Sequence, residues 1–155
     1  MRKILTLVIT TLCLLCSSVI NADTYPKQEF RAVWMCTVWN LDWPTQKGTS
    51  SSIQAAQKEE MTKYLDILAK DGFNAVFFQV RSMCDAMYKS SYEPWSSYLT
   101  GNRGTNPGWD PLSFVVSECH KRGMECHAWV NPYRFSTGSN WTTSNDNAMK
   151  NNGWL

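Results

Sequence analysis

The sequence has almost no excess of charge of either sign, because 15 Lys and Arg residues stand against 13 Asp and Glu and leave a formal net charge of +2 at pH 7. No run of Lys and Arg forms a basic stripe, so we expect no nucleic-acid partner. No Gly-rich G-x-G-x-x-G or Walker loop follows a predicted strand, which argues against a nucleotide-binding sheet. No cysteine spacing matches a zinc site, and we expect neither a metal nor another cofactor.

Four cysteines remain after residue 22: Cys36, Cys84, Cys119 and Cys126. An even number permits disulfides in an exported protein. Their positions on predicted strands, a helix and a loop favour instead small, buried apolar side chains. Aromatic residues, by contrast, are abundant, with 8 Trp, 6 Tyr and 6 Phe. Several of them fall in predicted loops, where core packing explains them less well.

Residues 1–22 have the three-part form of a secretory signal peptide: a positively charged start, a largely apolar run over 4–15, and a small, polar stretch before cleavage. The apolar run is too short for a stable membrane span. We expect cleavage after Ala22, no transmembrane segment in the mature protein, and export to the periplasm, the envelope or the medium. Lipoprotein anchoring at Cys13 or Cys16 is disfavoured, because Leu precedes both.

Residues 23–155 show strands alternating with helices. Apolar, β-branched and aromatic runs at 30–38, 74–80 and 124–130 predict three buried strands. A first amphipathic helix is predicted after Ser51 or Ser52 as N-cap, ending before Gly72. A second begins at Asp110-Pro111, an N-cap followed by proline at the first helical position, and ends before Gly123. A long loop over 81–109 separates the second strand from that helix.

This β-α-β-α-β order implies parallel pairing with right-handed crossovers. It fits either a doubly wound open sheet or the start of a (β/α)8 barrel. The loops after the strands are long and the connections after the helices are short, which favours a barrel with an elaborated top face. Because such a barrel needs roughly 250 residues, we expect residues 23–155 to be the N-terminal part, about three β/α units, of an incomplete barrel domain.

Polar side chains gather where the second and third strands end. Strand alternation puts Gln79 and Arg81 on the same face as His127, Trp129 and Asn131. Amide and guanidinium groups hydrogen-bond to vicinal hydroxyls, and aromatic rings stack on pyranose rings, so these residues predict a sugar-binding site. Three alternatives stay open: His127 as a hydrogen-bonded core residue, Arg81 paired with the nearby Asp85 to order the loop, and Trp129 as a filler of the barrel interior.

Glycoside hydrolysis usually needs two carboxylates, one of them with a raised pKa. The carboxylates near predicted strand ends are Asp42, Asp85 and Glu93. No context singles out an acid or a nucleophile, and Asp85 is the best catalytic candidate of the three. The loop that follows the second strand also supplies Tyr88 and Trp95.

Two long segments carry a family resemblance. They read FRAVWMCTVWNLDWPTQKG at 30–48 and FNAVFFQVRSMCDAMYKSSYEPWSSYLTGNRGTNPGWDPLSFVVSECHKRGMECHAWVNPYR at 73–134. Both closely resemble the glycosyl-hydrolase-like 10 family of exported bacterial proteins. The resemblance implies a (β/α)8 barrel, glycosidase activity, an envelope location and a substrate of the cell-wall glycan class, that is, peptidoglycan strands.

Within the resemblance, the motifs Q-V-R, D-A-x-Y, E-P-W and H-A-W-x-N-P-Y-R correspond to positions that line a substrate cleft. Those positions are Gln79, Arg81, Asp85, Tyr88, Glu93, Trp95, His127, Trp129, Asn131 and Arg134. Met83 and Cys84 depart from the small residues usual in the family. The family's acidic fourth-strand motif, expected to supply catalytic carboxylates, does not occur in the sequence.

The leading hypothesis is therefore a secreted glycoside hydrolase fragment that binds polysaccharide but lacks its main catalytic carboxylates. The alternatives are a non-catalytic glycan-binding module, using Trp95, Trp109, Trp129 and Arg134, and an inactive truncated fragment.

Overall fold

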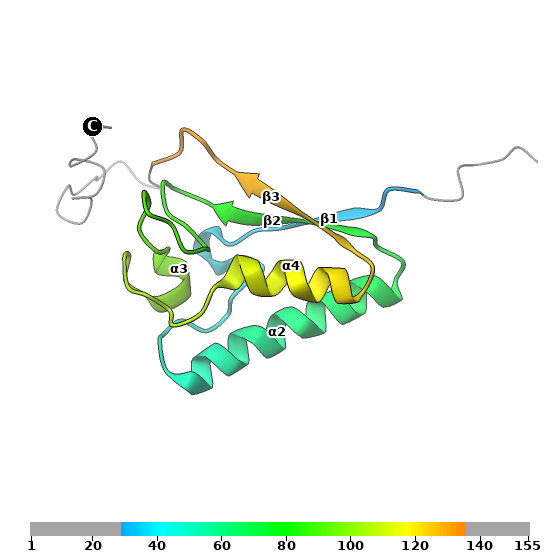
Figure 1. The fold of residues 1–155 in the computed structure, drawn as a ribbon, viewed down its shortest axis with the longest axis horizontal. Helices are drawn as coiled ribbons and strands as arrows, with labels where there is room; N and C mark the ends of the chain where they lie inside the picture. The colour runs from blue at the N-terminus through cyan, green and yellow to red at the C-terminus, as the bar shows by residue number, and fades with distance from the viewer. Residues whose placement is uncertain (1–28, 136–155) are drawn as a thin grey trace, which may run out of the picture.

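The computed structural model describes residues 29–135, so the predicted signal peptide and residues 136–155 lie outside the described part of the chain. The elements follow one another as β1 (Ala32–Met35), the 3-10 turn η1 (Val38–Asn40), α2 (Ser51–Lys70), β2 (Ala75–Arg81), α3 (Ser97–Thr100), α4 (Pro111–Lys121) and β3 (Glu125–Val130) (Figure 1).

The three strands form one parallel sheet in the order β1-β2-β3, which confirms the predicted pairing. In the register, Trp34 lies beside Phe77, and Phe77 lies beside His127. Helices α2 and α4 both lie on one side of this sheet (Figure 1). The result is a two-layer α/β arrangement in which the other face of the sheet carries no described helix.

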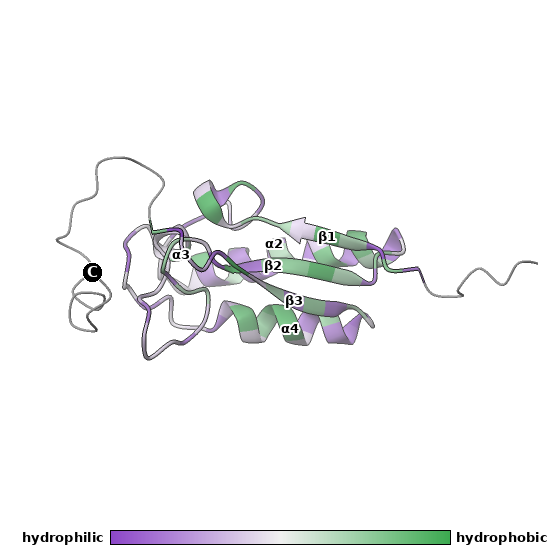
Figure 2. Cartoon of the chain, turned by 90° about the horizontal axis from the view of Figure 1, so that it is seen from above, coloured by the Kyte–Doolittle hydropathy of each residue, from purple (hydrophilic) through white to green (hydrophobic). Residues whose placement is uncertain are grey.

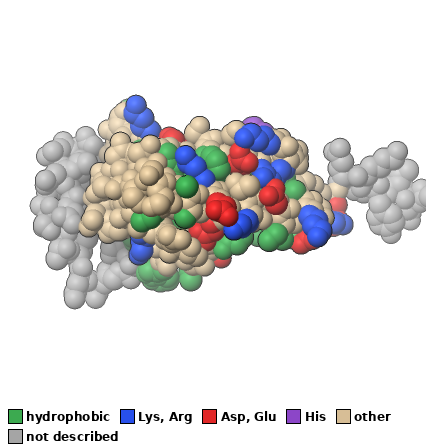
Figure 3. Space-filling view, turned by 90° about the horizontal axis from the view of Figure 1, so that it is seen from below, with side chains coloured by type: hydrophobic (Ala, Val, Ile, Leu, Met, Phe, Trp, Pro, Cys, Tyr) green, Lys and Arg blue, Asp and Glu red, His purple; other side chains and the backbone are tan. Residues whose placement is uncertain are grey.

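The core lies between the sheet and the two helices. Val76, Phe78 and Val80 of β2 point toward the helices and are at most 2% exposed. Met61 of α2 and Val115 of α4 meet them and are fully buried. The opposite, solvent-facing side of the helices mixes basic and acidic side chains (Figure 3), while the apolar residues concentrate on the strands and on the inward sides of the helices (Figure 2).

Local sequence signals explain where the helices begin and end. The Asp110 side chain accepts a hydrogen bond from the Ser113 amide and caps α4, with Pro111 at the first helical position, as predicted. The N-cap of α2 is Ser50, one residue before the prediction, because its extended backbone lets its hydroxyl accept from Ile53 N at 3.3 Å. None of the helices in the described residues is long and apolar enough to cross a membrane.

The end of the first strand and the content of the long loop also differ from the prediction. The first strand ends at Met35 instead of 38, because the backbone of Thr37 and Val38 turns to bond the side chain of Gln79. The long loop over 81–109 is not without structure, since it contains the short helix α3 and a parallel bridge between Ala86 and Trp95.

The helix-free face of the sheet is aromatic. The Trp34 ring stacks on Phe77 with ring centroids 4.6 Å apart, and Phe77 stacks on His127 at 4.9 Å. Trp129 meets Trp34 edge to face at 5.0 Å. Trp34 remains 58% exposed. This face carries the residues that strand alternation assigned to a barrel interior, and the opposite face of β2 is the one that packs on the helices.

Candidate functional site

The Gln79 side chain fastens the loop that follows β1. Its Oε1 accepts hydrogen bonds from the backbone N–H groups of Thr37 and Val38, both at 2.9 Å, and from the Thr37 hydroxyl at 3.3 Å. The residue is 1% exposed, and within the described chain its Nε2 has no hydrogen-bond partner. Gln79 was predicted to bind substrate; its position instead suits the support of a loop at the rim of the sheet.

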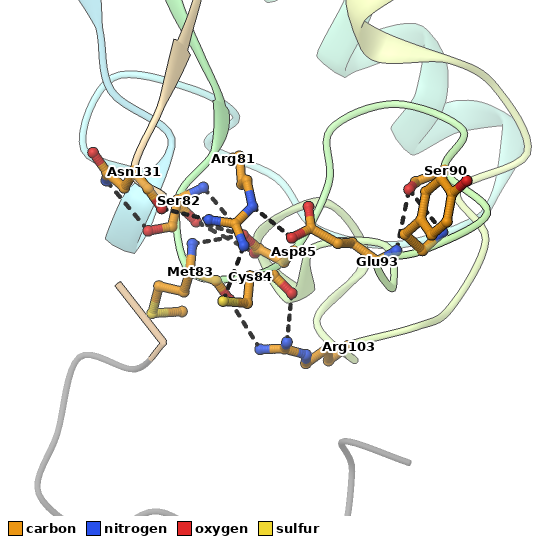
Figure 4. A network of polar contacts seen from close by, with 10 residues as sticks. Arg81, Ser82, Met83, Cys84, Asp85, Ser90, Glu93, Arg103 and Asn131 are labelled. Atoms are coloured by element: carbon orange, nitrogen blue, oxygen red, sulfur yellow. Dashed lines mark hydrogen bonds and ion pairs between the residues drawn. The ribbon is translucent and has the colours of Figure 1, made fainter. Parts of the chain in front are cut away.

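Arg81 forms a nearly buried ion pair with Glu93 (Figure 4). Their side chains are only 13% and 8% exposed. The guanidinium also donates to the Asn131 carbonyl and, at 3.1 Å, to the Cys84 sulfur. Burial is the largest single effect and lowers the pKa of Arg81, but the hydrogen bonds and charges of Glu93 and, to a smaller extent, Cys84 together outweigh it, so that the net pKa is raised. The alternative in which Arg81 pairs with Asp85 is wrong, because Glu93 is the partner.

Asp85 lies in the turn directly after β2 and is 1% exposed. Its carboxylate accepts from the Ser82 amide at 3.1 Å, the Met83 amide at 2.8 Å and the Ser82 hydroxyl at 3.0 Å (Figure 4). Arg103 holds the same turn from outside through the carbonyl oxygens of Met83 and Cys84. The predicted catalytic role of Asp85 stays a prediction, and this geometry favours ordering of the turn.

Asn131 joins the ends of β2 and β3. Its amide N–H donates to the Arg81 carbonyl at 3.0 Å, and its side chain accepts from the Trp129 indole at 3.0 Å and donates to the Ser82 carbonyl at 3.3 Å. The structure therefore brings together the predicted residues Arg81, Trp129 and Asn131. His127 lies two residues before Trp129 on β3, beside Phe77, with its Nε2 at 2.8 Å from a Glu125 oxygen. It does not join the network.

Tyr88 and Trp95 belong to the folded loop over 81–109. Tyr88 is half-buried beside the Arg81–Glu93 pair, and its pKa is raised by burial first and by the Glu93 charge second. Trp95 packs against the core, and its carbonyl accepts from Gly104 N at 2.8 Å. Tyr88 thus borders the ion pair, and Trp95 borders the core.

Asp42, the remaining carboxylate near a strand end, is exposed and accepts from the Cys36 amide at 2.7 Å, which closes the loop after β1. Burial is the main cause of the raised pKa of the Cys36 thiol; the hydrogen bond to the Val38 carbonyl opposes it, the Asp42 charge adds to it, and the Arg134 charge lowers it least. All four cysteines in the described residues are free thiols. Within residues 29–135 no group of three His, Cys, Asp or Glu side chains could hold a metal ion.

Sequence reasoning missed Trp39. It lies in η1 with a left-handed backbone (φ 57°, ψ 13°), is 59% exposed, and has the Arg134 guanidinium 5.6 Å from its ring centroid. Arg134, a predicted site residue, thus reaches from the end of β3 to the loop after β1. The only sequence signal was an aromatic residue between a strand and a turn-forming Asn-Leu-Asp segment, and it does not specify which way the indole points.

A parallel sheet covered by helices on one face, with a polar network where its strands end, defines an α/β protein built from successive β/α units. The chain belongs to the glycosyl hydrolase-like 10 family, whose sequence model matches residues 29–154. This confirms the family resemblance.

Two curated relatives are similar over most of the chain. Glycosyl hydrolase YngK of Bacillus subtilis (strain 168) is 43% identical over 157 aligned residues, which cover 99% of this chain and 30% of the relative. Glycosyl hydrolase DigH of Escherichia coli (strain K12) is 44% identical over 116 residues, which cover 72% of this chain and 26% of the relative. The chain thus spans less than a third of the length of these relatives.

Proposed function

We propose that this chain forms the substrate-binding beginning of an exported glycoside hydrolase that acts on polysaccharide of the bacterial cell-wall type. The observation that carries the proposal is the network of Arg81, Trp129 and Asn131, whose hydrogen bonds join the ends of β2 and β3. Active sites of (β/α)8 barrels lie at this end of the strands. Both curated relatives named above are glycosyl hydrolases.

The surrounding architecture in this proposal is a (β/α)8 barrel. Its support is the sequential strand order, with α2 and α4 on the same side of the sheet, as in a barrel that winds in one direction. Further β/α units would cover the aromatic face around Trp34 and Phe77, which is largely open. They would also cover a groove of about 280 Å³ on the flank of β1, between that strand and the Ile67 side of α2.

We further propose that the catalytic carboxylates come from other units of such a barrel. Near the strand ends of the described residues, Glu93 is engaged by Arg81, Asp85 by the turn at Ser82 and Met83, and Asp42 by the Cys36 amide. Each of these carboxylates already has a structural partner. The residues of this chain would orient the glycan, and two carboxylates elsewhere would carry out the cleavage. One would protonate the leaving oxygen, and the other would either attack the sugar as a nucleophile or activate a water molecule.

Export is proposed from the form of residues 1–22. A fusion of this segment to a reporter enzyme that needs disulfides should become active outside the cytoplasm. The same fusion with Arg2 and Lys3 changed to Glu should be exported less efficiently, and equal reporter activity from both would contradict the assignment.

A chimera tests the hydrolase proposal. Residues 29–135 of this chain replace the aligned segment of the Bacillus subtilis relative, and reducing ends released from purified glycan strands are measured. The folded chimera should hydrolyse the strands, whereas the 155-residue chain by itself should not. A chimera that unfolds cooperatively yet lacks activity would refute the proposal. Equal activity in the 155-residue chain would refute the placement of the acids elsewhere.

The second candidate function is a non-catalytic glycan-binding module, favoured by the structural engagement of Asp42, Asp85 and Glu93. It predicts tight binding by the 155-residue chain together with no hydrolysis by the folded chimera. An inactive fragment, the third hypothesis, predicts neither binding nor a cooperative unfolding transition of the chain.

A further inference from the structure

An exposed tryptophan stands on the loop at the C-terminal end of β1. Trp39 is 59% exposed although its neighbour Val38 is 4% exposed. Its backbone and that of Asn40 are both left-handed, with φ of 57° and 55°. Residues with a Cβ rarely adopt this conformation, and such outliers concentrate at ligand-binding positions. The indole therefore faces water on a backbone that local preference alone would not select.

The loop is clamped on both sides of this indole. Before it, the Thr37 and Val38 amides donate to Gln79 Oε1 at 2.9 Å. After it, the Asn40 side chain donates to the carbonyl oxygens of Pro44 at 2.7 Å and Tyr98 at 2.8 Å. These bonds hold the position of Trp39 without using its own side chain. A rigidly presented aromatic ring loses little conformational entropy when a ligand stacks on it.

Arg134 supplies a charge beside this ring. Its guanidinium lies 5.6 Å from the centroid of the indole, and within the described residues no carboxylate pairs with it. Arg31, Arg81 and Arg122, in contrast, each have an acidic partner. A planar cation of this kind is suited to bidentate binding of a carboxylate.

We propose that Trp39 and Arg134 form a subsite for a sugar ring that carries a carboxylate. The indole stacks on the apolar face of the pyranose, and the Arg134 guanidinium binds the acidic substituent. This assignment rests on the proposed function, since it names one position of the glycan on the same rim. It goes further in identifying the stacking residue and in requiring a negative charge on the bound ring.

The test uses calorimetric titration of the 155-residue chain with two matched probes. One is a cell-wall tetrasaccharide in which every second ring bears a lactyl carboxylate, and the other is the same compound after reduction of its carboxylates to alcohols. Trp39→Ala should weaken binding of both probes by about tenfold. Arg134→Gln should weaken only the acidic probe, again by about tenfold, and added salt should do the same.

The matched control is Phe30→Ala. Phe30 is also an aromatic residue with 59% exposure, but it lies before β1, at the other end of that strand, against Phe77 and His127. This change should leave both affinities unaltered. Trp39→Phe keeps a smaller ring and should give an intermediate loss, which preserves the test if the alanine variant fails to fold. Thermal unfolding of each variant identifies the folded ones.

Unchanged affinity in folded Trp39 variants would overturn the subsite, as would a wild-type chain that binds neither probe. Equally weakened binding of both probes in Arg134→Gln would overturn the proposal that Arg134 binds the carboxylate. The chimera separates this result from the proposed function. An active chimera that is indifferent to Trp39→Ala refutes the subsite alone, whereas an inactive chimera combined with Trp39-dependent binding by the chain refutes the hydrolase alone.

Discussion

Replacing Gln79 by leucine should release the loop after β1. The amide oxygen of Gln79 accepts from two backbone N–H groups, those of Thr37 and Val38, at a site that is 1% exposed. Leucine has a similar volume but no acceptor, so both donors lose their partner in a buried setting. Each unsatisfied buried donor costs about 1–3 kcal/mol.

The net magnitude is smaller than the sum of two full penalties. The Nε2 group of Gln79 has no partner among the described residues, so its removal is favourable. The Thr37 hydroxyl also keeps its 3.0 Å hydrogen bond to the Gln79 carbonyl. We therefore expect Gln79→Leu to lower the free energy of unfolding by about 3 kcal/mol. With a urea m-value of about 1.5 kcal/mol per molar for a chain of this size, the midpoint should fall by about 2 M.

Urea unfolding followed by tryptophan fluorescence gives the stability, and amide hydrogen exchange locates the change. The Thr37 and Val38 amides should lose protection in Gln79→Leu while the amides of β2 keep theirs relative to global unfolding. Thr37→Val is the control, because it removes only the hydroxyl and should cost about 1 kcal/mol. A loss below about 1 kcal/mol in Gln79→Leu, with both amides still protected, would refute the clamp.

Three further predictions concern buried polar groups and thiols. Glu93→Gln leaves the Arg81 charge without its ion-pair partner and should lower the free energy of unfolding by about 3 kcal/mol. A double-mutant cycle with Arg81→Met should show that the two effects are not additive, and simple additivity would contradict the pairing. Asp85→Asn should lower stability by about 2 kcal/mol while the folded chimera keeps its activity within about tenfold, whereas loss of a catalytic acid would cost roughly 10²–10⁴-fold. The hydrogen bond from Cys119 lowers the pKa of the Cys126 thiol against the opposing effect of burial. Cys119→Ala should therefore raise that pKa and shift the alkylation of Cys126 to higher pH. Mass spectrometry of the alkylated chain measures the pH midpoint, and a midpoint that does not move or that falls would disprove the coupling.

The elements themselves were predictable because their signals are local. The Asp110-Pro111 start of α4 depends on a side chain that caps an amide three residues away, at Ser113. The buried face of β2 followed from strand alternation, since Val76, Phe78 and Val80 are the residues that contact the helices. The Ser50 cap of α2 was missed by one residue, because Ser50 is followed by two further serines that are equally good caps in composition.

The site was predicted only in part, because its contacts join distant segments. From the sequence, a pairing of Arg81 with Asp85, four residues further on, was one open alternative to a role in sugar binding. The loop over 81–109 instead folds back and brings Glu93 to Arg81, while Asp85 bonds the amides of its own turn. Asn131 was expected to face the glycan directly, yet its amide joins the Trp129 indole to the Ser82 carbonyl.

What the sequence by itself determined is the order of the three strands and of the two long helices, the cap of α4, the buried side of β2 and, through motifs spread over both long segments, the family. These properties depend on neighbours within a few residues or on patterns read along the chain. Only the tertiary structure decided that Gln79 supports the first loop, that Glu93 neutralises Arg81, and that Arg134 lies beside Trp39. The physical reason is that each of these contacts forms only after the parallel sheet has brought the ends of β1, β2 and β3 to one edge. Residue type and spacing along the sequence do not specify which of these side chains come into contact.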